Sequence, residues 1–222
     1  RLRLLLFAIL LLVGCHDSAR LALLPPGSQV LAFGDSITFG SGAAPGEDYP
    51  VRLAAISGWQ VHNAGIPGDT ADAAQARIHA ALAQTRPALV IVEIGGNDFL
   101  RRRPEAAVKD DLRAIVRAIR QSGSQVVLVA VPRLSLLGAA SGRLPDSAIY
   151  AELAKEERLP LVEGVLAAIL SDPTLKADPI HPPAGGYREL ADGIAEQLRR
   201  SGLLKVMQGF TSLDEVLGNT NV

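Results

Sequence analysis

The sequence is short of several features, and each scarcity narrows what the chain can be. Cys15 is the only cysteine among 222 residues, which excludes a disulfide within the chain. The chain carries 22 Lys and Arg against 23 Asp and Glu, and its formal net charge of −1 offers no electrostatic footprint for nucleic acid. The apolar run 4–13 is too short to span a bilayer. A nucleic-acid partner is therefore not expected.

What is present indicates a globular chain. Hydrophobic residues make up 48% of the sequence and charged residues 20%, a balance that argues against disorder. The length suits one domain with a sizeable core. The short basic run Arg101-Arg102-Arg103 fits a solvated loop better than a phosphate site.

The amino-terminal residues predict an export signal. Arg1 and Arg3 form a positive start, and the apolar run 4–13 follows directly. The run ends in Gly14-Cys15, which resembles the lipobox of bacterial lipoproteins, where the signal is cleaved before a cysteine that is then lipidated. A plain signal peptide with a chance cysteine is the alternative. We expect a signal peptide over 1–14, a tether over 15–28 and a membrane anchor at Cys15 facing the periplasm. His16 in place of Asp after the cysteine favours the outer membrane.

Strand and helix patterns alternate through residues 29–202, which we expect to form one domain. Short apolar runs predict strands over 29–33, 60–63, 89–94, 125–131 and 161–162. Helical patterns fall over 49–57, from a cap at 69 or 70 through 83, and over 106–122, 146–157 and 186–201. Repeated βα units with right-handed crossovers predict an α/β fold, a five-stranded parallel sheet between helices. The tail 203–222 is expected to be an appended segment without an assigned function.

The block Gly34-Asp35-Ser36-Ile37-Thr38 follows the first predicted strand, at the sheet edge where ligands bind in open α/β folds. Ser36 there is a candidate nucleophile if a base can reach it. No Gly-Lys-Ser/Thr follows, so the phosphate-loop pattern fails. Thr38 stands where the nucleophile elbow of α/β-hydrolases needs its second glycine, so that fold is not expected. An ordinary turn or helix cap is the remaining alternative.

His181 is the best candidate base among the four histidines. His16 lies in the tether, His62 in a strand pattern and His79 in a helix pattern. Only His181 lies in an irregular loop near a carboxylate, three residues after Asp178. That spacing lets the carboxylate accept the imidazole N–H, which fixes the tautomer and stabilises the imidazolium formed during attack.

Acyl transfer also needs hydrogen-bond donors for the developing oxyanion. Three candidates follow predicted strands: the backbone N–H of Ser36, the backbone N–H of Gly65 and the side-chain amide of Asn97 in Gly95-Gly96-Asn97-Asp98. Gly65 has no Cβ to obstruct a substrate. For Gly65 and Asn97 an ordinary turn role is the alternative.

These four blocks, in this order, resemble those of the SGNH (GDSL) hydrolase family over residues 29–202. Their spacing is most similar to the thioesterase I/lysophospholipase L1/arylesterase branch. The resemblance implies a flavodoxin-like three-layer α/β/α sandwich and a serine esterase that needs no metal and no cofactor. Pro179 departs from the glycine that many members carry.

The substrate is the least specified part of the interpretation. The apolar loop tip predicts Leu134, Leu136 and Leu137 as residues that bind an acyl chain, although packing in the core is the alternative. The expected substrate is a small acyl ester or thioester. A carbohydrate acetyl-esterase would use the same groups, and a non-catalytic binding lipoprotein on the same fold is the alternative from another class.

Overall fold

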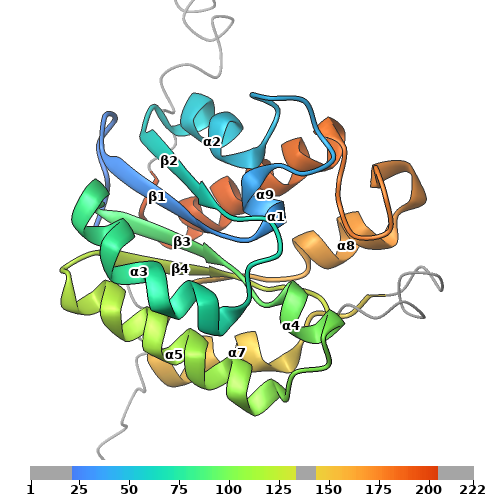
Figure 1. Ribbon diagram of the computed structural model, residues 1–222. Helices are drawn as coiled ribbons and strands as arrows, with labels where there is room; N and C mark the ends of the chain where they lie inside the picture. Colours follow the sequence, from blue (N-terminus) through green and yellow to red (C-terminus); the bar gives the residue numbers. More distant parts are fainter. Residues whose placement is uncertain (1–21, 134–143, 205–222) are drawn as a thin grey trace, which may run out of the picture.

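The protein is described by a computed structural model, in which residues 22–133 and 144–204 are described. Its centre is a five-stranded, entirely parallel sheet in the order β2-β1-β3-β4-β5 (Figure 1). This is the flavodoxin-like strand order. The predicted fold class is therefore confirmed. The strands are β1 Gln29–Gly34, β2 Gln60–Gly65, β3 Leu89–Glu93, β4 Gln125–Val129 and β5 Leu161–Val162.

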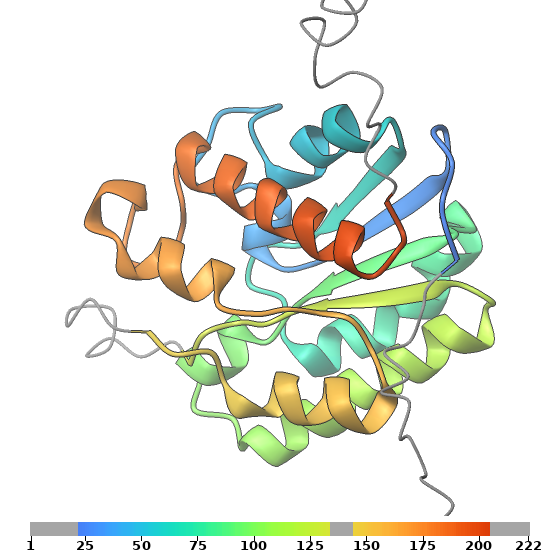
Figure 2. The same cartoon turned by 180° about the vertical axis from the view of Figure 1, so that it is seen from behind.

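Helices cover both faces of the sheet, which gives three layers. The helices α3, α5 and α7 lie over one face, and α2 and α9 over the other (Figures 1 and 2). The helices of these two layers are α2 Tyr49–Ser57, α3 Ala71–Thr85, α5 Glu105–Gln121, α7 Ala148–Glu157 and α9 Ala184–Arg200. Shorter elements are α1 Ser36–Phe39, α4 Gly96–Leu100, α8 Val165–Ser171 and a 3₁₀ turn at Pro173–Leu175.

The apolar patterns that predicted these elements are the ones that fill the core. Every residue of β3 is buried, as expected for a central strand covered on both faces. Helix α5 buries one stripe and exposes the other. Its inward residues are Val108, Leu112, Ile115, Val116, Ala118 and Ile119. These two elements place the core in the middle of the sheet, beneath the loops at its carboxyl edge.

The sequence missed the short helices that shape those loops. Helix α1 begins at Ser36 and spans only four residues, because Asp35 caps it through a hydrogen bond from the Ile37 N–H and Gly40 ends it with φ 100°. Helices α4 and α8 were not predicted either, since segments this short carry little periodicity.

Three expectations concern residues outside the described part of the chain. Cys15 with the signal segment 1–14, the loop tip that carries Leu134, Leu136 and Leu137, and the tail from 205 onward are not covered. Within residues 22–133 and 144–204, no helix combines the length and apolarity that a membrane span requires.

Candidate active site

Ser36 is the first residue of α1, directly beyond the carboxyl end of β1. The strand reaches this turn through Gly34, where a Cβ would collide with the Glu93 carbonyl and with Thr38. Only glycine lets β1 and β3 approach this closely before the chain turns. The Ser36 N–H lies in the first turn of α1, where a backbone N–H has no partner within the helix.

The structure brings Ser36, His181 and Asp178 into one chain of hydrogen bonds. His181 Nε2 lies 2.9 Å from Ser36 Oγ, and His181 Nδ1 lies 2.7 Å from Asp178 Oδ2. The second carboxylate oxygen of Asp178 accepts the N–H groups of Ile180 at 2.9 Å and His181 at 3.0 Å. The residues predicted from distant parts of the sequence therefore meet with the geometry of a nucleophile, its base and the group that orients the base.

The loop from Asp178 to His181 holds the carboxylate in its charged form. Partial burial acts to raise the pKa of Asp178, but the hydrogen bonds from the His181 ring and the Ile180 N–H outweigh it, so the pKa lies below its ordinary value. The other described histidines lie elsewhere. His62 Nε2 contacts Gln29 Oε1 at 2.5 Å, at the start of β1, and His79 is exposed on α3.

Asn97 reaches the site from α4, immediately after β3. Its Nδ2 donates two hydrogen bonds, to the Asp69 carbonyl at 2.9 Å and to Asp35 Oδ2 at 3.3 Å. The following residue, Asp98, is fully buried, and its Oδ2 accepts the Ala71 N–H at the start of α3. Asn97 is thus held against both the nucleophile turn and the loop between β2 and α3.

The backbone of Gly65 does not offer the donor expected of it. Its N–H donates to Asn63 Oδ1 at 2.9 Å, and a Cβ here would collide with the backbone of Phe39. Gly65 therefore lets β2 pack against the end of α1. The prediction that Gly65 donates to the oxyanion is not met in this conformation, because the Asn63 side chain of the same strand already accepts its N–H.

A different glycine of the same loop presents a free donor. Gly68 has φ 81° at the third position of a turn in which the Asp69 N–H donates to the Ile66 carbonyl at 3.1 Å. Among the described residues no acceptor contacts the Gly68 N–H, and a Cβ at Gly68 would meet only open space. Pro67-Gly68 is the residue pair that a type II turn favours, which is the sequence signal that could have identified this position.

Two buried carboxyl groups, those of Glu93 and Asp35, lie beneath the nucleophile, and no sequence pattern assigned either of them a role. Glu93 ends β3 fully buried, and its Oε2 accepts a hydrogen bond from Thr38 Oγ1 at 2.9 Å. Burial, and then the nearby Asp35, raises the pKa of Glu93 well above its ordinary value. Burial likewise raises the pKa of Asp35 to about 7, against the hydrogen bond from the Ile37 N–H. Tyr49 completes the cluster, with its hydroxyl 3.1 Å from Thr38 Oγ1.

A small cavity opens beside Ser36 and Asn97. Asp35, Glu93 and Gly96 supply its remaining polar groups and backbone. Apolar side chains form the rest of its wall: Ile37, Leu100, Val131, Leu166, Leu170 and Ile180. The cavity itself is about 10 Å³, room for about one water, so these side chains can border the hydrocarbon part of an acyl group next to the nucleophile but do not enclose it.

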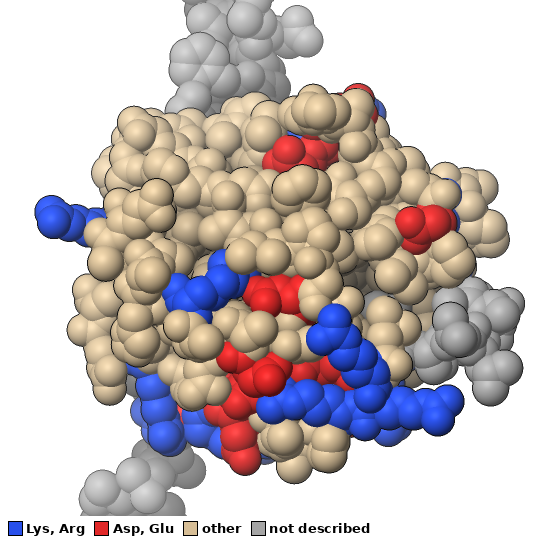
Figure 3. All heavy atoms as spheres, in the orientation of Figure 1, with Lys and Arg blue, Asp and Glu red and all other residues tan. Residues whose placement is uncertain are grey.

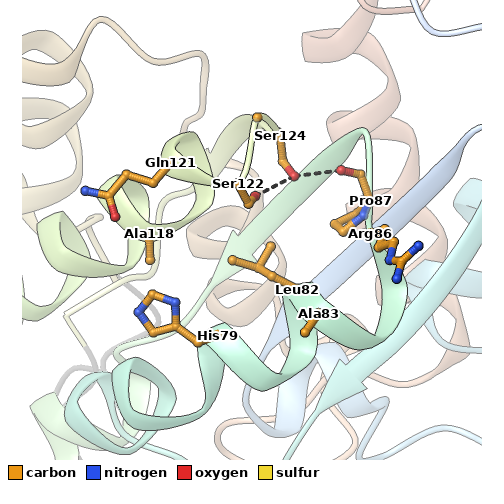
Figure 4. Close-up of a pocket in the computed structure, with 10 residues that line it drawn as sticks. His79, Leu82, Ala83, Arg86, Pro87, Ala118, Gln121, Ser122 and Ser124 are labelled. Carbon is orange, nitrogen blue, oxygen red and sulfur yellow. Dashed lines mark hydrogen bonds between the residues drawn. The ribbon is translucent and has the colours of Figure 1, made fainter.

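A larger groove lies at the other end of the sheet, away from this chemistry. It runs between the ends of α3 and α5, where His79, Leu82 and Gln121 face it (Figure 4). Ser124, just before β4, donates to the Pro87 carbonyl at its floor. This position is the amino edge of the sheet, opposite to Ser36, so the groove takes no part in the site.

In the basic run at 101–103, Arg101 and Arg103 form polar contacts within the protein. Arg103 Nη1 lies 2.9 Å from Asp98 and 2.6 Å from Asp111, and Arg101 Nη2 donates to the Gly68 carbonyl at 3.0 Å. Charged side chains of both signs intermingle over this face (Figure 3). In residues 22–133 and 144–204, no cluster of three His, Cys, Asp or Glu is arranged to hold a metal ion.

Comparisons with known proteins agree with this geometry. Residues 32–189 match the GDSL-like Lipase/Acylhydrolase family. Thioesterase 1/protease 1/lysophospholipase L1 of Escherichia coli (strain K12) is 33% identical over 178 residues, which cover 77% of this chain and 83% of that protein. Esterase TesA of Pseudomonas aeruginosa is 30% identical over 198 residues, 86% of this chain and 97% of the relative.

Solved structures give the same result at the level of the fold. A crystal structure of TesA superposes with a TM-score of 0.68 at 29% identity, covering 78% of this chain and 98% of the other. The SGNH-hydrolase family esterase AlinE4 superposes with a TM-score of 0.61 at 30% identity, covering 80% of this chain and 98% of the other. The chain belongs to the GDSL-like lipase/acylhydrolase family and is an enzyme that hydrolyses ester bonds.

Proposed function

We propose that this enzyme cleaves its ester through an acyl-enzyme on Ser36. The observation that carries the proposal is the continuous hydrogen-bond chain from Ser36 Oγ through His181 to Asp178. His181 Nε2 takes the hydroxyl proton as Ser36 Oγ attacks the acyl carbon, and Asp178 stabilises the resulting imidazolium. The imidazolium then gives its proton to the leaving alcohol or thiol. Water, deprotonated by the same His181, releases the acid and restores Ser36.

The oxyanion of the tetrahedral intermediate is assigned to three donors. They are the Ser36 N–H, the Gly68 N–H, which replaces Gly65 in this role, and the Asn97 amide. The Asn97 Nδ2 already donates to the Asp69 carbonyl at 2.9 Å and to Asp35 Oδ2 at 3.3 Å, so the oxyanion would take the place of the longer contact with Asp35. The Gly68 assignment is supported by its free N–H and by the hydrogen bond that ties the adjacent Asp69 carbonyl to Asn97. A crystal structure of the enzyme inhibited by a phosphonate ester tests it. The phosphonyl oxygen should lie within about 3.2 Å of the Gly68 nitrogen. An oxygen bound by the Gly65 nitrogen would overturn the assignment.

The proposed substrates are acyl esters or thioesters with an apolar acyl group. Support comes from the apolar wall beside Ser36 and from relatives named thioesterase, lysophospholipase and esterase. Leu134, Leu136 and Leu137 stay predictions, since they lie outside the described residues. If they extend the apolar wall, Leu136→Ser should flatten the rise of kcat/KM with acyl length and spare acetyl esters.

A panel of p-nitrophenyl esters and acyl-CoAs, assayed with wild type and Ser36→Ala, tests the proposal. We expect kcat/KM to rise with acyl length while the apolar wall is being filled, by up to ~0.8 kcal/mol for each buried methylene. Ser36→Ala should lose at least about 10⁴-fold in kcat. A wild type that prefers acetyl esters would instead favour a carbohydrate acetyl-esterase. Ester hydrolysis retained in Ser36→Ala would exclude the acyl-enzyme, and no hydrolysis of any ester would favour a binding lipoprotein.

We also propose that Cys15 is lipidated and anchors the enzyme to a membrane facing the periplasm, with the outer membrane favoured. The support is the sequence 1–15 alone. In a bacterial host, the mature protein should fractionate with membranes and Cys15→Ser should be released or remain unprocessed, because two or more acyl chains anchor stably. Mass spectrometry that finds an unmodified Cys15 in the mature protein would refute the anchor.

A further inference from the structure

Arg77 is a residue of α3 whose side chain reaches from the helix layer to the carboxyl edge of the sheet. Its guanidinium carbon lies 4.1 Å from the centroid of the Phe33 ring, in a cation–π arrangement. Only 21% of the side chain is exposed. Arg77 lies in none of the sequence motifs and takes no part in the proposed reaction.

The guanidinium contacts three separate segments at once. Arg77 Nη2 donates to the Gly34 carbonyl at 2.9 Å, and Nη1 donates to the Ala64 carbonyl at 3.0 Å. Nε donates to Asp69 Oδ2 at 2.8 Å, which closes an ion pair with a carboxylate that is itself almost buried. These are the last carbonyl of β1 before the nucleophile turn, the carbonyl near the end of β2, and the loop that follows β2.

Two of the three acceptors, Gly34 and Asp69, are directly connected to groups assigned to the site. Gly34 is two residues before Ser36. Asp69 follows Gly68, and its own carbonyl accepts the Asn97 amide at 2.9 Å. Through these links one side chain joins the nucleophile turn, the loop that offers the Gly68 N–H, and the hydrogen bond that orients Asn97.

The chemistry of the contact requires arginine. A planar guanidinium presents its N–H groups in a fixed fork, so two carbonyls and a carboxylate can be bound simultaneously in one plane. Lysine could keep the charge beside Asp69, but its single ammonium could not hold both strand-end carbonyls in the same geometry. At the end of β1 the Gly34 carbonyl also accepts the Ile66 N–H at 3.1 Å, so Arg77 adds a second hydrogen bond there.

We propose that Arg77 is the positioning residue that fixes the nucleophile turn and the oxyanion donors relative to one another. The inference rests on the proposed function, since it takes Ser36, Gly68 and Asn97 as the groups to be aligned. Arg77 touches neither substrate nor reacting atoms. Other hydrogen bonds also join the two segments, from the Ile66 N–H to the Gly34 carbonyl at 3.1 Å and from Asn63 Nδ2 to the Thr38 carbonyl at 2.8 Å. Loss of Arg77 would remove the bonds that hold Asp69 against both strand ends, and displacement by about 1 Å can cost 10²-fold in rate.

The experiment compares Arg77→Gln and Arg77→Lys with Arg113→Gln. Arg113 is a matched control, because its side chain is 22% exposed and it also forms ion pairs, with Asp110 and Glu156, away from the site. We expect Arg77→Gln to lower kcat by about 10–100-fold with KM within about threefold of wild type. Arg77→Lys should lie between Arg77→Gln and wild type, and Arg113→Gln should match wild type.

Hydrogen exchange measured on the same variants provides a readout that does not depend on ester hydrolysis. In Arg77→Gln, amides in 34–40 and 63–70 should exchange faster, while β3 and β4 keep their protection; Arg113→Gln should leave both segments unchanged. Unaltered exchange in both segments would overturn the proposal whether or not the enzyme hydrolyses esters. So would faster exchange with an unchanged kcat, or a loss of kcat in Arg77→Gln no larger than in Arg113→Gln. Absence of hydrolysis in wild type, with faster exchange in Arg77→Gln, would count against the proposed function. It would still support the role of Arg77 in holding segments 34–40 and 63–70 together.

Discussion

The loop that carries Asp178 and the buried carboxyl groups of Glu93 and Asp35 beneath Ser36, here called the floor, are two acidic regions with opposite properties. The Asp178 side chain is 47% exposed, accepts three hydrogen bonds and has a lowered pKa. Glu93 is fully buried, accepts one side-chain hydrogen bond from Thr38, and has a strongly raised pKa. Both lie at the carboxyl edge of one sheet, yet the surroundings favour the charged form of Asp178 and the protonated form of Glu93.

The difference separates the two tasks that the site requires. A negative charge at Asp178 stabilises the imidazolium that His181 becomes during attack. A negative charge on the floor would instead oppose the oxyanion, which develops on the same side of the sheet as Asn97. Solvation and hydrogen bonding therefore divide the carboxyl groups between roles that their residue types alone do not distinguish.

The largest expected effect comes from replacing each acid by its amide. Asp178→Asn removes a charge that the reaction uses and should lower kcat by about 10²–10⁴-fold. Glu93→Gln replaces a neutral acid with a neutral amide and should change kcat by less than about threefold. Steady-state kinetics on one p-nitrophenyl ester measures both. Equal losses in the two variants would end the distinction between the regions.

Asn97 tests the oxyanion side of the comparison. Asn97→Ala should lower kcat by about 10²–10³-fold with little change in KM, because a preorganised donor acts mainly on the transition state. Asn97→Asp, which adds a carboxylate beside Asp35, should be at least as damaging. An effect confined to KM would reassign Asn97 to substrate binding.

The pH dependence of stability should differ in sign between the regions. The folded state holds a proton on Glu93 that the unfolded chain loses above about pH 4.5, so this group's contribution declines as pH rises. Asp178 contributes stability above its ordinary pKa and loses it on acidification. Urea unfolding from pH 5 to 8 should show a shallower decline in Glu93→Gln, by up to about 1.4 kcal/mol per pH unit. Identical slopes in wild type and Glu93→Gln would mean that Glu93 is already charged in the folded protein.

The smallest expected effect concerns the Thr38 hydroxyl, which donates a hydrogen bond to Glu93. Thr38→Val keeps the shape of the side chain but removes the hydrogen bond to Glu93 and the contact with Tyr49. We expect a loss of about 1–3 kcal/mol in the free energy of unfolding, since buried polar atoms lose a partner. Thr85→Val, on the outer end of α3, is the control and should cost less. If Thr38→Val left the free energy of unfolding unchanged, water would have to replace the hydrogen bonds of Thr38 to Glu93 and Tyr49.

Much of the fold was predictable because its signals are local. Continuous apolar runs gave β3 and β4, and the 3.6-residue spacing of apolar side chains gave α5 within one residue at each end. Ser36, Asp178 and His181 were predicted because each stands in a short block with few alternatives. The 3₁₀ turn at Pro173–Leu175 and the short helices α1, α4 and α8 lack such periodicity and were missed.

The sequence by itself determined the order of the strands and the longer helices, the family resemblance and the residues of the hydrogen-bonded triad, because these depend on periodicity and on rare residue types in order. The tertiary structure alone decided which donors are free and which acids are charged. Asn63 accepts the Gly65 N–H and leaves the Gly68 N–H available, burial favours the protonated form of Glu93, and Arg77 crosses from α3 to two strand ends. Such properties belong to distances between segments far apart in the chain, and no local pattern encodes them.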